Sequence, residues 1–439
     1  MKETIIQFGE GNFLRAFADD FINELNKKGL YDGKVVIVKP TPRGNLDKFE
    51  EQKCVYNLLV RGIKDTEDFS EIKEINSLSR CVNPYSDFDE FLALAKNKDA
   101  KIIISNTTEA GIVFDEKCEF SDRPALSFPA KLTQLLFERY KAGLDGFIIL
   151  PCELIDNNAK ALKDCVLRYA EEWELEEGFI KWINEKNRFI NTLVDRIVSG
   201  YPKEEAEIIC RKIGYNDKLL DTAEPYHLWA IEANIEDDLP LKEAGVNVVY
   251  TDDIAPIKKR KVRLLNGTHT AIVFPAMLCG AKTVDECFKD EDLNEFLRAY
   301  LFKTALAVLA KSDENEDFAD AIIERFKNPY LHHRLESISL NSVSKFRERI
   351  APTVAGYKAI YGFVPKNISF SLSALIYYYK NYPVSDDKET VEFIKRSSVF
   401  DILKSGIFGV GPEIGNDVSK GIEFINDDKI REGLRWALS

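Results

Sequence analysis

The segment 261–269 brings together three residue types that can act on a carbonyl group. It contains Lys261, Asn266 and His269, and the whole chain has only four histidines. A lysine can exchange a proton with an alcohol or a carbonyl oxygen. An amide and an imidazole can hold that oxygen while negative charge develops on it. These three residues are therefore candidate catalytic groups for a reaction that interconverts an alcohol and a carbonyl.

Each of the three also has a structural interpretation. Basic residues crowd positions 258–263, and such a run is typical of a solvated surface or an anion-binding patch. Asn266 suits the N-cap of the apolar helix expected after it, and His269 suits a hydrogen-bonded position in a core. Residues three apart on a helix share one face, however, so Asn266 and His269 can address the same oxygen.

A lysine that takes up and releases protons near neutral pH needs a special environment. Its usual pKa lies about four units too high, so burial or nearby positive charge must lower it. Arg260, Lys259 and the start of a helix at 266–268 are the expected sources of that charge.

The start of the chain has the pattern of a dinucleotide-binding β-α-β unit. Residues 4–8 predict a buried strand, Gly9 and Gly11 follow it, and the next segment repeats large apolar residues at helical spacing. A second apolar strand is predicted at 34–38. Glycines at this turn let the backbone approach a pyrophosphate, which the helix N-terminus attracts. The third glycine of the usual fingerprint is absent, so a plain strand-to-helix turn is the alternative.

The carboxyl ends of parallel strands are where a dinucleotide would bind. The candidate cofactor-binding residues follow the first strand and the strand predicted at 101–107, and they are Phe8, Gly9, Gly11, Asn12, Phe13, Asn106, Thr108 and Glu109. The second strand ends without the acidic residue that would bind a ribose hydroxyl, and Lys39 and Arg43 follow it. The glycine turn predicts an NAD-type dinucleotide as the cofactor, and on these residues the choice between NAD and NADP stays open.

The order of apolar runs and helical patterns predicts two domains. Over residues 1–255 they alternate, which predicts an α/β domain with a Rossmann-like, doubly wound, mostly parallel sheet. Its further strands are predicted at 54–60, 101–107, 145–151 and 247–253, and its helices at 88–97, 125–143 and 158–175. Residues 256–439 predict a mostly α-helical substrate and catalytic domain. The segment 261–269 is then expected where the domains join, a usual place for a site.

Composition argues against several classes of function. A formal net charge of −13 and a pI near 5.1 oppose nucleic-acid binding. The eight cysteines have neither CxxC pairs nor metal-ligand spacing, so we expect no disulfide framework and no metal site. No apolar stretch is long enough to span a membrane, and a strand pattern begins almost at once, so we expect a cytoplasmic location and no membrane partner. The sequence specifies no oligomeric state.

The chain carries five motifs in a fixed order: IIQFGEGNFLRAF, SNTTEAGI, PCELIDNN, LVDRIVSGYP and KVRLLNGTHTA. In these motifs and over its whole length it resembles the long-chain polyol dehydrogenase family, which includes mannitol dehydrogenase, and within it the members that reduce keto-uronates. The resemblance implies an NAD-linked, metal-independent interconversion of D-tagaturonate and D-altronate. The family signature Lys-x4-Asn-x2-His falls on Lys261, Asn266 and His269, with the lysine as general acid/base. Fructuronate reduction, action on an uncharged polyol and a non-catalytic dinucleotide-binding regulator are the alternatives.

The resemblance also implies residues around the substrate. Asp195 matches a family position near the substrate, although an ion pair with Arg196 explains an acid there equally well. Lys345 matches a substrate-binding lysine of the family. Mannitol-type enzymes carry an arginine eight positions before that lysine, where this chain has Ser337.

A second departure affects the expected oxyanion site. The Cys-Asp-Asn of mannitol-type enzymes, whose Asn helps to bind the oxyanion, is Cys152-Glu153-Leu154 here, so Asn158 or Asn266 would have to supply the amide. A uronate carries a carboxylate, which favours a cation with paired hydrogen bonds. Between positions 325 and 349 the candidates for that cation are His332, His333, Arg334, Lys345, Arg347 and Arg349. A solvated helix face is the alternative for most of them.

Overall fold

The computed structural model describes residues 1–108, 110–331 and 333–439. The chain folds into two compact units. The first consists of Met1–Arg61 and Asp68–Ile254, and the second consists of Gly62–Glu67 and Ala255–Ser439. In these described ranges, no helix combines the length and the apolar character that crossing a membrane requires.

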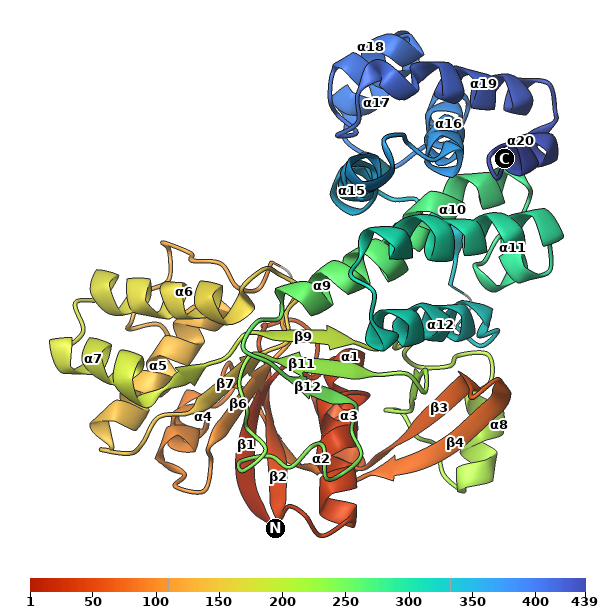
Figure 1. Cartoon of the computed structure of the whole chain (residues 1–439). Coiled ribbons are helices and arrows are strands. Elements are labelled where there is room, and N and C mark those ends of the chain that lie inside the picture. The colour runs from red at the N-terminus through yellow and green to blue at the C-terminus, as the bar shows by residue number, and fades with distance from the viewer. Residues whose placement is uncertain (109, 332) are drawn as a thin grey trace. The chain divides into compact units, whose positions relative to one another are not determined.

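A six-stranded parallel sheet forms the centre of the first unit (Figure 1). In spatial order its strands are β5 (Leu78–Val82), β2 (Gly33–Val38), β1 (Lys2–Phe8), β6 (Ile102–Ser105), β7 (Ile148–Pro151) and β8 (Arg188–Phe189). Each neighbouring pair is parallel. In β1, Ile5 packs into one core while Ile6 and Phe8 pack into another. Burial on both faces explains the continuous apolar runs and confirms the predicted doubly wound sheet.

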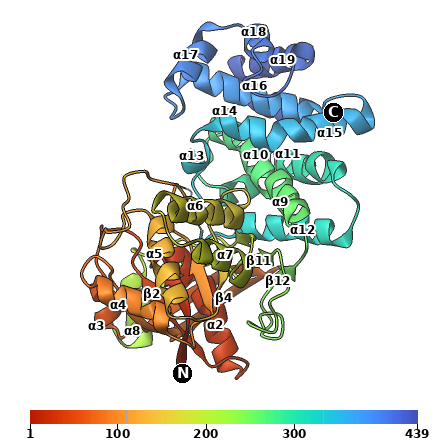
Figure 2. The same cartoon turned by 90° about the vertical axis from the view of Figure 1, so that its left-hand side faces the viewer.

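Helices cover both faces of this sheet. On the face of Phe8 the core is completed by α4 (Phe88–Ala93), α5 (Phe128–Lys141), α6 (Asn158–Glu172) and α7 (Glu177–Lys186), which face the viewer in Figure 2. The opposite face is covered by α1 (Asn12–Arg15) and α2 (Ala18–Lys27). There, Phe17 and Phe21 pack against Trp229 at ring-centroid distances of 5.4 and 6.2 Å. The short helix α3 (Asp47–Glu51) adds Phe49 to this second core, and α8 (Ala206–Ile213) packs into a small separate cluster with Leu59 and Leu220.

Two three-stranded sheets accompany the main sheet. The first has the order β10 (Asp221–Ala223), β3 (Tyr56–Lys64) and β4 (Glu67–Ile75). The second has the order β12 (Val248–Tyr250), β11 (Leu228–Ile231) and β9 (Thr192–Asp195). The prediction that 54–60 and 247–253 belong to the doubly wound sheet is therefore wrong. A local apolar run predicts a strand, but it does not specify which distant strand pairs with it.

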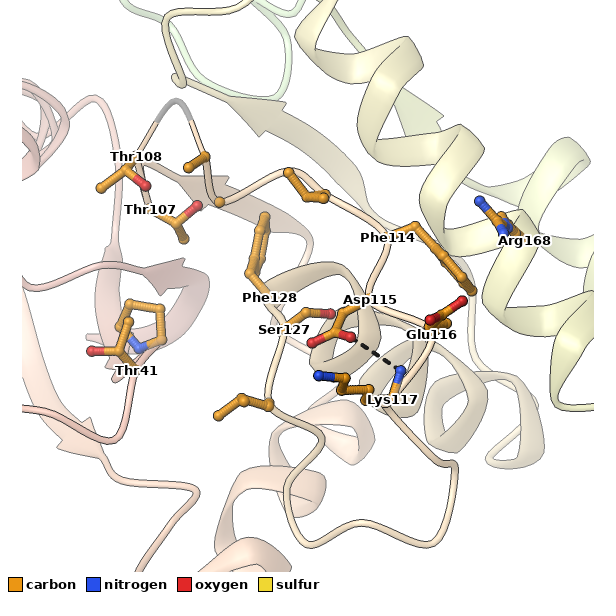
Figure 3. A pocket seen from close by; sticks show the side chains of 15 residues that line it. Thr41, Thr107, Thr108, Phe114, Asp115, Glu116, Lys117, Ser127, Phe128 and Arg168 are labelled. Carbon is orange, nitrogen blue, oxygen red and sulfur yellow. Dashed lines mark hydrogen bonds between the residues drawn. The ribbon is translucent and has the colours of Figure 1, made fainter.

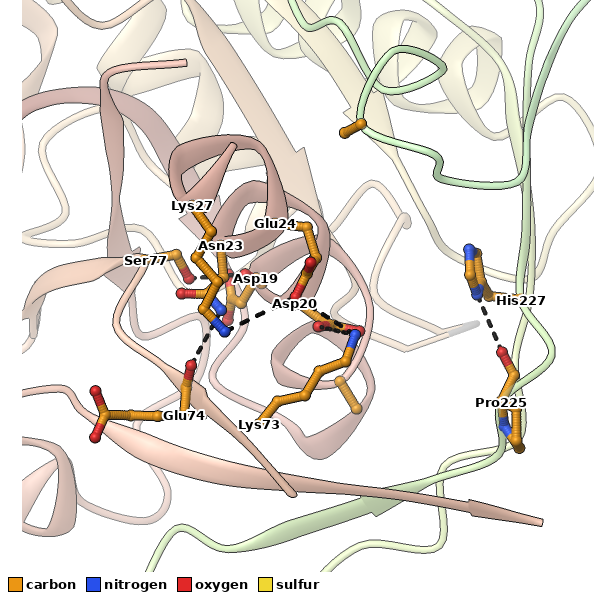
Figure 4. Close-up of polar contacts among 12 residues, drawn as sticks. Asp19, Asp20, Asn23, Glu24, Lys27, Lys73, Glu74, Ser77, Pro225 and His227 are labelled. Atoms are coloured by element: carbon orange, nitrogen blue, oxygen red, sulfur yellow. Dashed lines mark hydrogen bonds and ion pairs between the residues drawn. The ribbon is translucent and has the colours of Figure 1, made fainter. Parts of the chain in front are cut away.

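A buried polar network lies under α2 (Figure 4). The Asp20 carboxylate accepts from Arg196 Nη1 at 2.8 Å and pairs with Lys73 Nζ at 3.3 Å, which offsets the cost of burying it. His227 Nδ1 lies 3.2 Å from the Pro225 carbonyl. Its Nε2 accepts from a backbone N–H at 3.1 Å, which fixes the proton on Nδ1. Burial lowers the pKa of His227 to about 4, so this histidine is a neutral structural residue.

The second unit is built from helices, which confirms the predicted mostly helical C-terminal part. They are α9 (Ala255–Lys261), α10 (Gly267–Leu278), α11 (Glu291–Arg298), α12 (Asp313–Lys327), α13 (Leu335–Ile338), α14 (Ser342–Lys345), α15 (Ala351–Tyr361), α16 (Lys366–Asn381), α17 (Lys388–Arg396), α18 (Val399–Lys404), α19 (Gly415–Asn426) and α20 (Ile430–Trp436). Helix α10 is apolar on all sides and is buried from Gly267 to Ala276, as a central helix must be. It is tied to α16 by a hydrogen bond from Ser371 Oγ to the Ala271 carbonyl at 2.8 Å.

Candidate active site

Lys261, Asn266 and His269 lie on one continuous helical segment. Helix α9 ends at Lys261, the π-helical segment Val262–Asn266 follows directly, and α10 begins at Gly267. Asn266 has φ −71° and ψ −35°, and its side chain caps nothing. The N-cap interpretation of Asn266 is therefore wrong, and so is the expected helix start at 266–268 as a source of positive charge. Wider π turns of this kind occur often at functional sites.

His269 is buried but not satisfied by the surrounding protein. Its side chain stacks on Phe326 at 4.2 Å with an interplanar angle of 19°, and it meets His333 edge-on at 4.7 Å. The residue is 7% exposed, and its Nε2 has no hydrogen-bond partner in the described part of the chain. A core histidine would have a partner there, because an unpaired buried polar atom is costly. This nitrogen is therefore available to a bound oxygen.

Four basic side chains act electrostatically on His269, and we call them the basic cluster: Arg325, His333, Lys345 and Arg349. Burial lowers the pKa of His269 well below its usual value, and each member of the basic cluster lowers it further. Burial likewise lowers the pKa of His333 and that of Lys345. The site is thus a positively charged environment around a neutral imidazole.

Hydrogen bonds hold the basic cluster beside α10. Arg349 lies on a second π-helical segment, Phe346–Ile350, and its Nη1 is 3.5 Å from Thr270 Oγ1. Arg263 Nη1 donates to the main-chain carbonyls of Glu348 at 2.9 Å and Arg349 at 3.2 Å, which joins the two π-helical segments. Lys345 Nζ donates to the main-chain carbonyl of Ile338 at 2.9 Å.

The basic residues proposed from the sequence fall into two groups, those that lower the pKa of His269 and those that are exposed. His333, Lys345 and Arg349 are among the groups that lower the pKa of His269 most, whereas Arg334 and Arg347 are exposed and are not. His332 lies outside the described residues. Sequence reasoning missed Arg325, a buried residue of α12. Its signal was a cation three residues after Ile322 on the apolar face of that helix.

The turn after β1 has two glycines in different environments. Gly9 has φ +129°, and a Cβ added there would lie 3.0 Å from the Asn106 carbonyl oxygen. Only glycine adopts this conformation without strain. Gly11 precedes α1 with an ordinary φ of −67°, and an added Cβ would meet nothing within 4 Å. The space beside the Gly11 Cα is therefore open among the described residues, so a ligand can approach the backbone at this helix N-terminus.

A hollow of about 680 Å³ lies beside the carboxyl ends of β2 and β6 (Figure 3). Its lining includes Thr41, Thr107, Thr108, Phe114, Ser127 and Phe128. The volume falls in the range of small-molecule pockets. The hollow also lies near the point where the strand order reverses between β1 and β6, which is where open α/β sheets bind ligands.

Glu153 joins the ends of β6 and β7, a role that the sequence did not reveal. Its Oε1 accepts from Thr107 N at 2.9 Å and Thr107 Oγ1 at 3.0 Å, and its Oε2 accepts from Ser105 Oγ at 3.0 Å. Burial raises the pKa of Glu153. Asn106 Nδ2 donates to the Cys152 carbonyl at 2.7 Å. Where mannitol-type enzymes have Cys-Asp-Asn, this chain therefore has a buried carboxyl group, that of Glu153. It holds Thr107, which lines the hollow beside β2 and β6.

The other predicted cofactor residues differ in what their side chains do. Phe8 is fully buried against Phe128 at a ring-centroid distance of 5.0 Å, so only its main chain lies at the turn. Phe13 stacks on Phe17 at 5.0 Å. Asn12, which is exposed, accepts a hydrogen bond from the Arg15 guanidinium. Thr108 lines the hollow, and Glu109 lies outside the described residues.

Lys39 is part of its own loop. Its Nζ donates to the carbonyl of Pro42 at 3.4 Å and to the carbonyl of Gly44, and the residue is only 3% exposed. Arg43 is exposed. Of the two cations that could bind a ribose 2′-phosphate, Lys39 is therefore already hydrogen-bonded within its own loop.

Asn158 and Asp195 occupy buried positions in the first unit. Asn158 Nδ2 lies within 3.1 Å of the carbonyls of Pro151, Glu153 and Thr192, and its Oδ1 accepts from Thr192 N at 3.1 Å. Both N–H groups of Asn158 are therefore used by the main chain, which leaves none for an oxyanion. Asp195 ends β9, and the neighbouring Arg196 forms its ion pair with Asp20.

Known proteins similar to this chain agree with its two-part organisation. The mannitol dehydrogenase Rossmann domain matches residues 3–243, and the mannitol dehydrogenase C-terminal domain matches residues 253–396. An altronate oxidoreductase of Bacillus subtilis is 43% identical over 400 residues, which are 90% of this chain and 83% of that protein. One of Shigella flexneri is 44% identical over 404 residues, which are 89% of this chain and 84% of that protein.

Solved structures show the same fold. A D-sorbitol dehydrogenase in substrate-free form aligns over 99% of this chain and 95% of its own, with a TM-score of 0.87 and 22% identity. The Pseudomonas fluorescens mannitol 2-dehydrogenase, solved with NAD and D-mannitol, aligns over 100% and 94%, with a TM-score of 0.75 and 20% identity. From the two family matches and the relatives above 40% identity it follows that the chain belongs to the mannitol dehydrogenase family and is a dehydrogenase acting on CH–OH groups.

Proposed function

We propose that this protein is an NAD-dependent reductase of a keto-uronate that interconverts D-tagaturonate and D-altronate. The observation that carries the substrate class is the basic cluster beside the buried Nε2 of His269, to which no described residue forms a hydrogen bond. A sugar acid brings a carboxylate, which offsets the positive charge of this site. The altronate oxidoreductases at 43–44% identity support the same substrate.

In the second unit, Lys261, Asn266 and His269 are suited to the proton-transfer step of the reaction. In the direction of reduction, Lys261 donates a proton to the substrate oxygen while the carbonyl carbon becomes an alcohol carbon. Asn266 and His269, which lie five and eight residues after Lys261, hold that oxygen as it becomes negative. Asp195 is retained as a contact for a substrate hydroxyl, and Asn158 is left out because the main chain uses its amide.

A dinucleotide fits the first unit. Gly11 leaves open space at the N-terminus of α1, where a pyrophosphate is favoured, and the hollow near β2 and β6 suits an adenosine. When bound, NADH would supply the hydride that reduces the carbonyl carbon. We favour NAD over NADP because the Lys39 ammonium is held by its own loop. NADH should therefore give the higher kcat/KM of the two cofactors.

The basic cluster also defines how the substrate is held. Lys345 and Arg349 are the proposed carboxylate contacts, since both are partly exposed and both lower the pKa of His269. An uncharged ketose has no carboxylate that Lys345 and Arg349 could bind. Fructuronate carries the same carboxylate as tagaturonate and remains the second candidate, because the two keto-acids differ only in stereochemistry.

The test is a comparison of rates with NADH on tagaturonate, fructuronate and fructose. The proposal predicts the highest kcat/KM on tagaturonate and a value on fructose at least about 100-fold lower. A higher value on fructuronate would replace the substrate but keep the reaction class. Comparable values on fructose and tagaturonate would contradict the assignment to a keto-uronate.

A further inference from the structure

The first unit has a second hollow at the opposite edge of its main sheet from the dinucleotide turn. It has a volume of about 460 Å³ and lies beside the amino ends of β6 and β7, near the loop before β8. Apolar side chains, Leu144, Phe147 and Ile148, contribute to its lining. Each residue of a strand advances about 3.3 Å, so the four residues of β6 separate this hollow from the dinucleotide edge by about 13 Å.

The lining of this hollow is basic in a strongly acidic protein. Its charged residues are Lys98, Lys101, Arg139, Lys186, Arg188, Asp145 and Asp238. They carry a formal net charge of +3, from five cations and two acids, whereas the whole chain carries −13. Local positive charge of this kind concentrates anions in a hollow with low-dielectric walls.

The lysines of the hollow are not used by the protein. Lys98, Lys101 and Lys186 are exposed, and none has a carboxylate within 4 Å among residues 1–108, 110–331 and 333–439. Arg188 is the member that has an ion pair, with Asp238 at 3.5 Å. Three ammonium groups around the hollow are therefore available to a bound anion.

Arg139 adds a buried positive charge to the lining. It is 3% exposed, and it donates to the main-chain carbonyls of Asp145 at 2.8 Å, Asn97 at 2.6 Å, Ala100 at 2.9 Å and Ala95 at 3.2 Å. Its guanidinium also lies over the Phe147 ring, 4.3 Å from the centroid. Burial lowers its pKa, and no carboxylate in the described chain lies within ion-pair distance of it. Main-chain carbonyls and the Phe147 ring hold this charge, and no described carboxylate forms an ion pair with it.

We propose that this hollow is a binding site for a small anion with at least two negative charges. Lys101 and Lys186 approach the anion from the chain segments that lead into β6 and β8, and the Arg139 charge strengthens their attraction from the protein side. Ammonium groups bind phosphate as point charges and bind carboxylates equally well. A phosphorylated metabolite and a polycarboxylate therefore share the required chemistry.

The test is calorimetric titration of the full-length protein at low ionic strength, with saturating NAD so that the dinucleotide turn is filled. Pyrophosphate and citrate are the two probes. We expect saturable binding of at least one of them, at one anion per chain and with a Kd below about 1 mM. Tighter binding of pyrophosphate would identify a phosphorylated ligand, and tighter binding of citrate would identify a polycarboxylate.

Two double variants test whether the measured heat of anion binding comes from this hollow. Lys101→Ala with Lys186→Ala should weaken binding at least about tenfold, because two charge-assisted contacts are lost from exposed positions that do not support the fold. Lys160→Ala with Lys181→Ala removes the same charge from lysines that pair with Asp164 and Glu185 on α6 and α7, and it should stay within about twofold of the parent. No saturable binding to the parent protein would overturn the proposal, and so would equal weakening in both double variants.

Discussion

The state of His269 follows from the side chains around it. Burial and the basic cluster keep its pKa well below the usual value, so the ring is uncharged at neutral pH. A neutral imidazole has one N–H, which it can donate to the substrate oxygen without adding charge to the basic cluster. Arg325, Lys345 and Arg349, which help to keep the ring neutral, are also the charges that would attract a sugar acid.

Arg349→Met tests the proposed carboxylate contact. Because the arginine would act on the charged end of the substrate, KM for tagaturonate should rise about 10- to 100-fold while kcat/KM for fructose stays within about twofold. Arg347→Met is the matched control, since Arg347 lies two positions earlier, is exposed and is not among the main contributors to the pKa shift of His269. Steady-state kinetics with NADH measure both. Equal losses on the two substrates would show that Arg349 supports the fold instead.

The two glycines after β1 predict opposite effects of a methyl group. Gly9→Ala should destabilise the protein by about 1–3 kcal/mol, because the position needs a positive φ and the Asn106 carbonyl is 3.0 Å away. The methyl group of Gly11→Ala would extend into open space, so the melting temperature should stay within about 2 °C. Because that space is where the pyrophosphate would approach, NADH should bind about tenfold more weakly. Thermal denaturation and fluorescence titration of NADH measure the two effects. Unchanged NADH affinity in Gly11→Ala would place the pyrophosphate elsewhere.

At the scale of elements, the continuity of α9, the π-helical segment and α10 positions the candidate site. The segment carries Lys261 at one end and leads into the buried helix that holds His269. Gly267 stands at the junction, where an added Cβ would lie 2.8 Å from the hydroxyl of Tyr300. Tyr300 itself belongs to a third π-helical segment, Ala299–Ala305.

Gly267→Ala should therefore cost about 1–3 kcal/mol of stability through the clash with Tyr300. Tyr300→Phe removes the hydroxyl that clashes, so the double variant should be more stable than the sum of the two single effects predicts. Urea denaturation of the parent, the two single variants and the double variant gives this coupling. Additive effects would mean that the hydroxyl does not limit the approach of the two segments.

The local sequence predicted most helices and strands correctly. It did not predict features that depend on residues far apart in the chain. The strand, glycine turn and helix at the chain start were predictable because each depends on neighbouring residues. The pairing of 54–60 and 247–253 with smaller sheets was not, since their partners lie far along the chain. Asn266 looked like an N-cap because a π-helical segment has no distinct pattern. The position of Arg325 on the apolar face of α12 was visible in the sequence, but its place beside His269 depends on the tertiary packing of α12 against α10.

At the scale of the whole molecule, buried acids make stability depend on pH. Burial raises the pKa of Asp19 to about 8 and that of Asp221 to about 6. Both acids ionise near pH 4 in the unfolded chain, so between there and their folded pKa values the folded state binds more protons. The free energy of unfolding should therefore fall as pH rises toward 8. Asp19→Asn should flatten that decline, as melting temperatures between about pH 5 and pH 9 would show; an unchanged slope would contradict it.

The central claim is that Lys261 supplies the proton in the reduction of a keto-uronate. The most direct measurement is single-turnover reduction of tagaturonate by NADH in Lys261→Met. The account predicts a rate at least about 100-fold below the parent, with NADH affinity within about twofold. The control Lys289→Met, which removes an exposed lysine paired with Asp285, should keep the parent rate. A Lys261→Met variant that reduces tagaturonate at close to the parent rate would contradict the account.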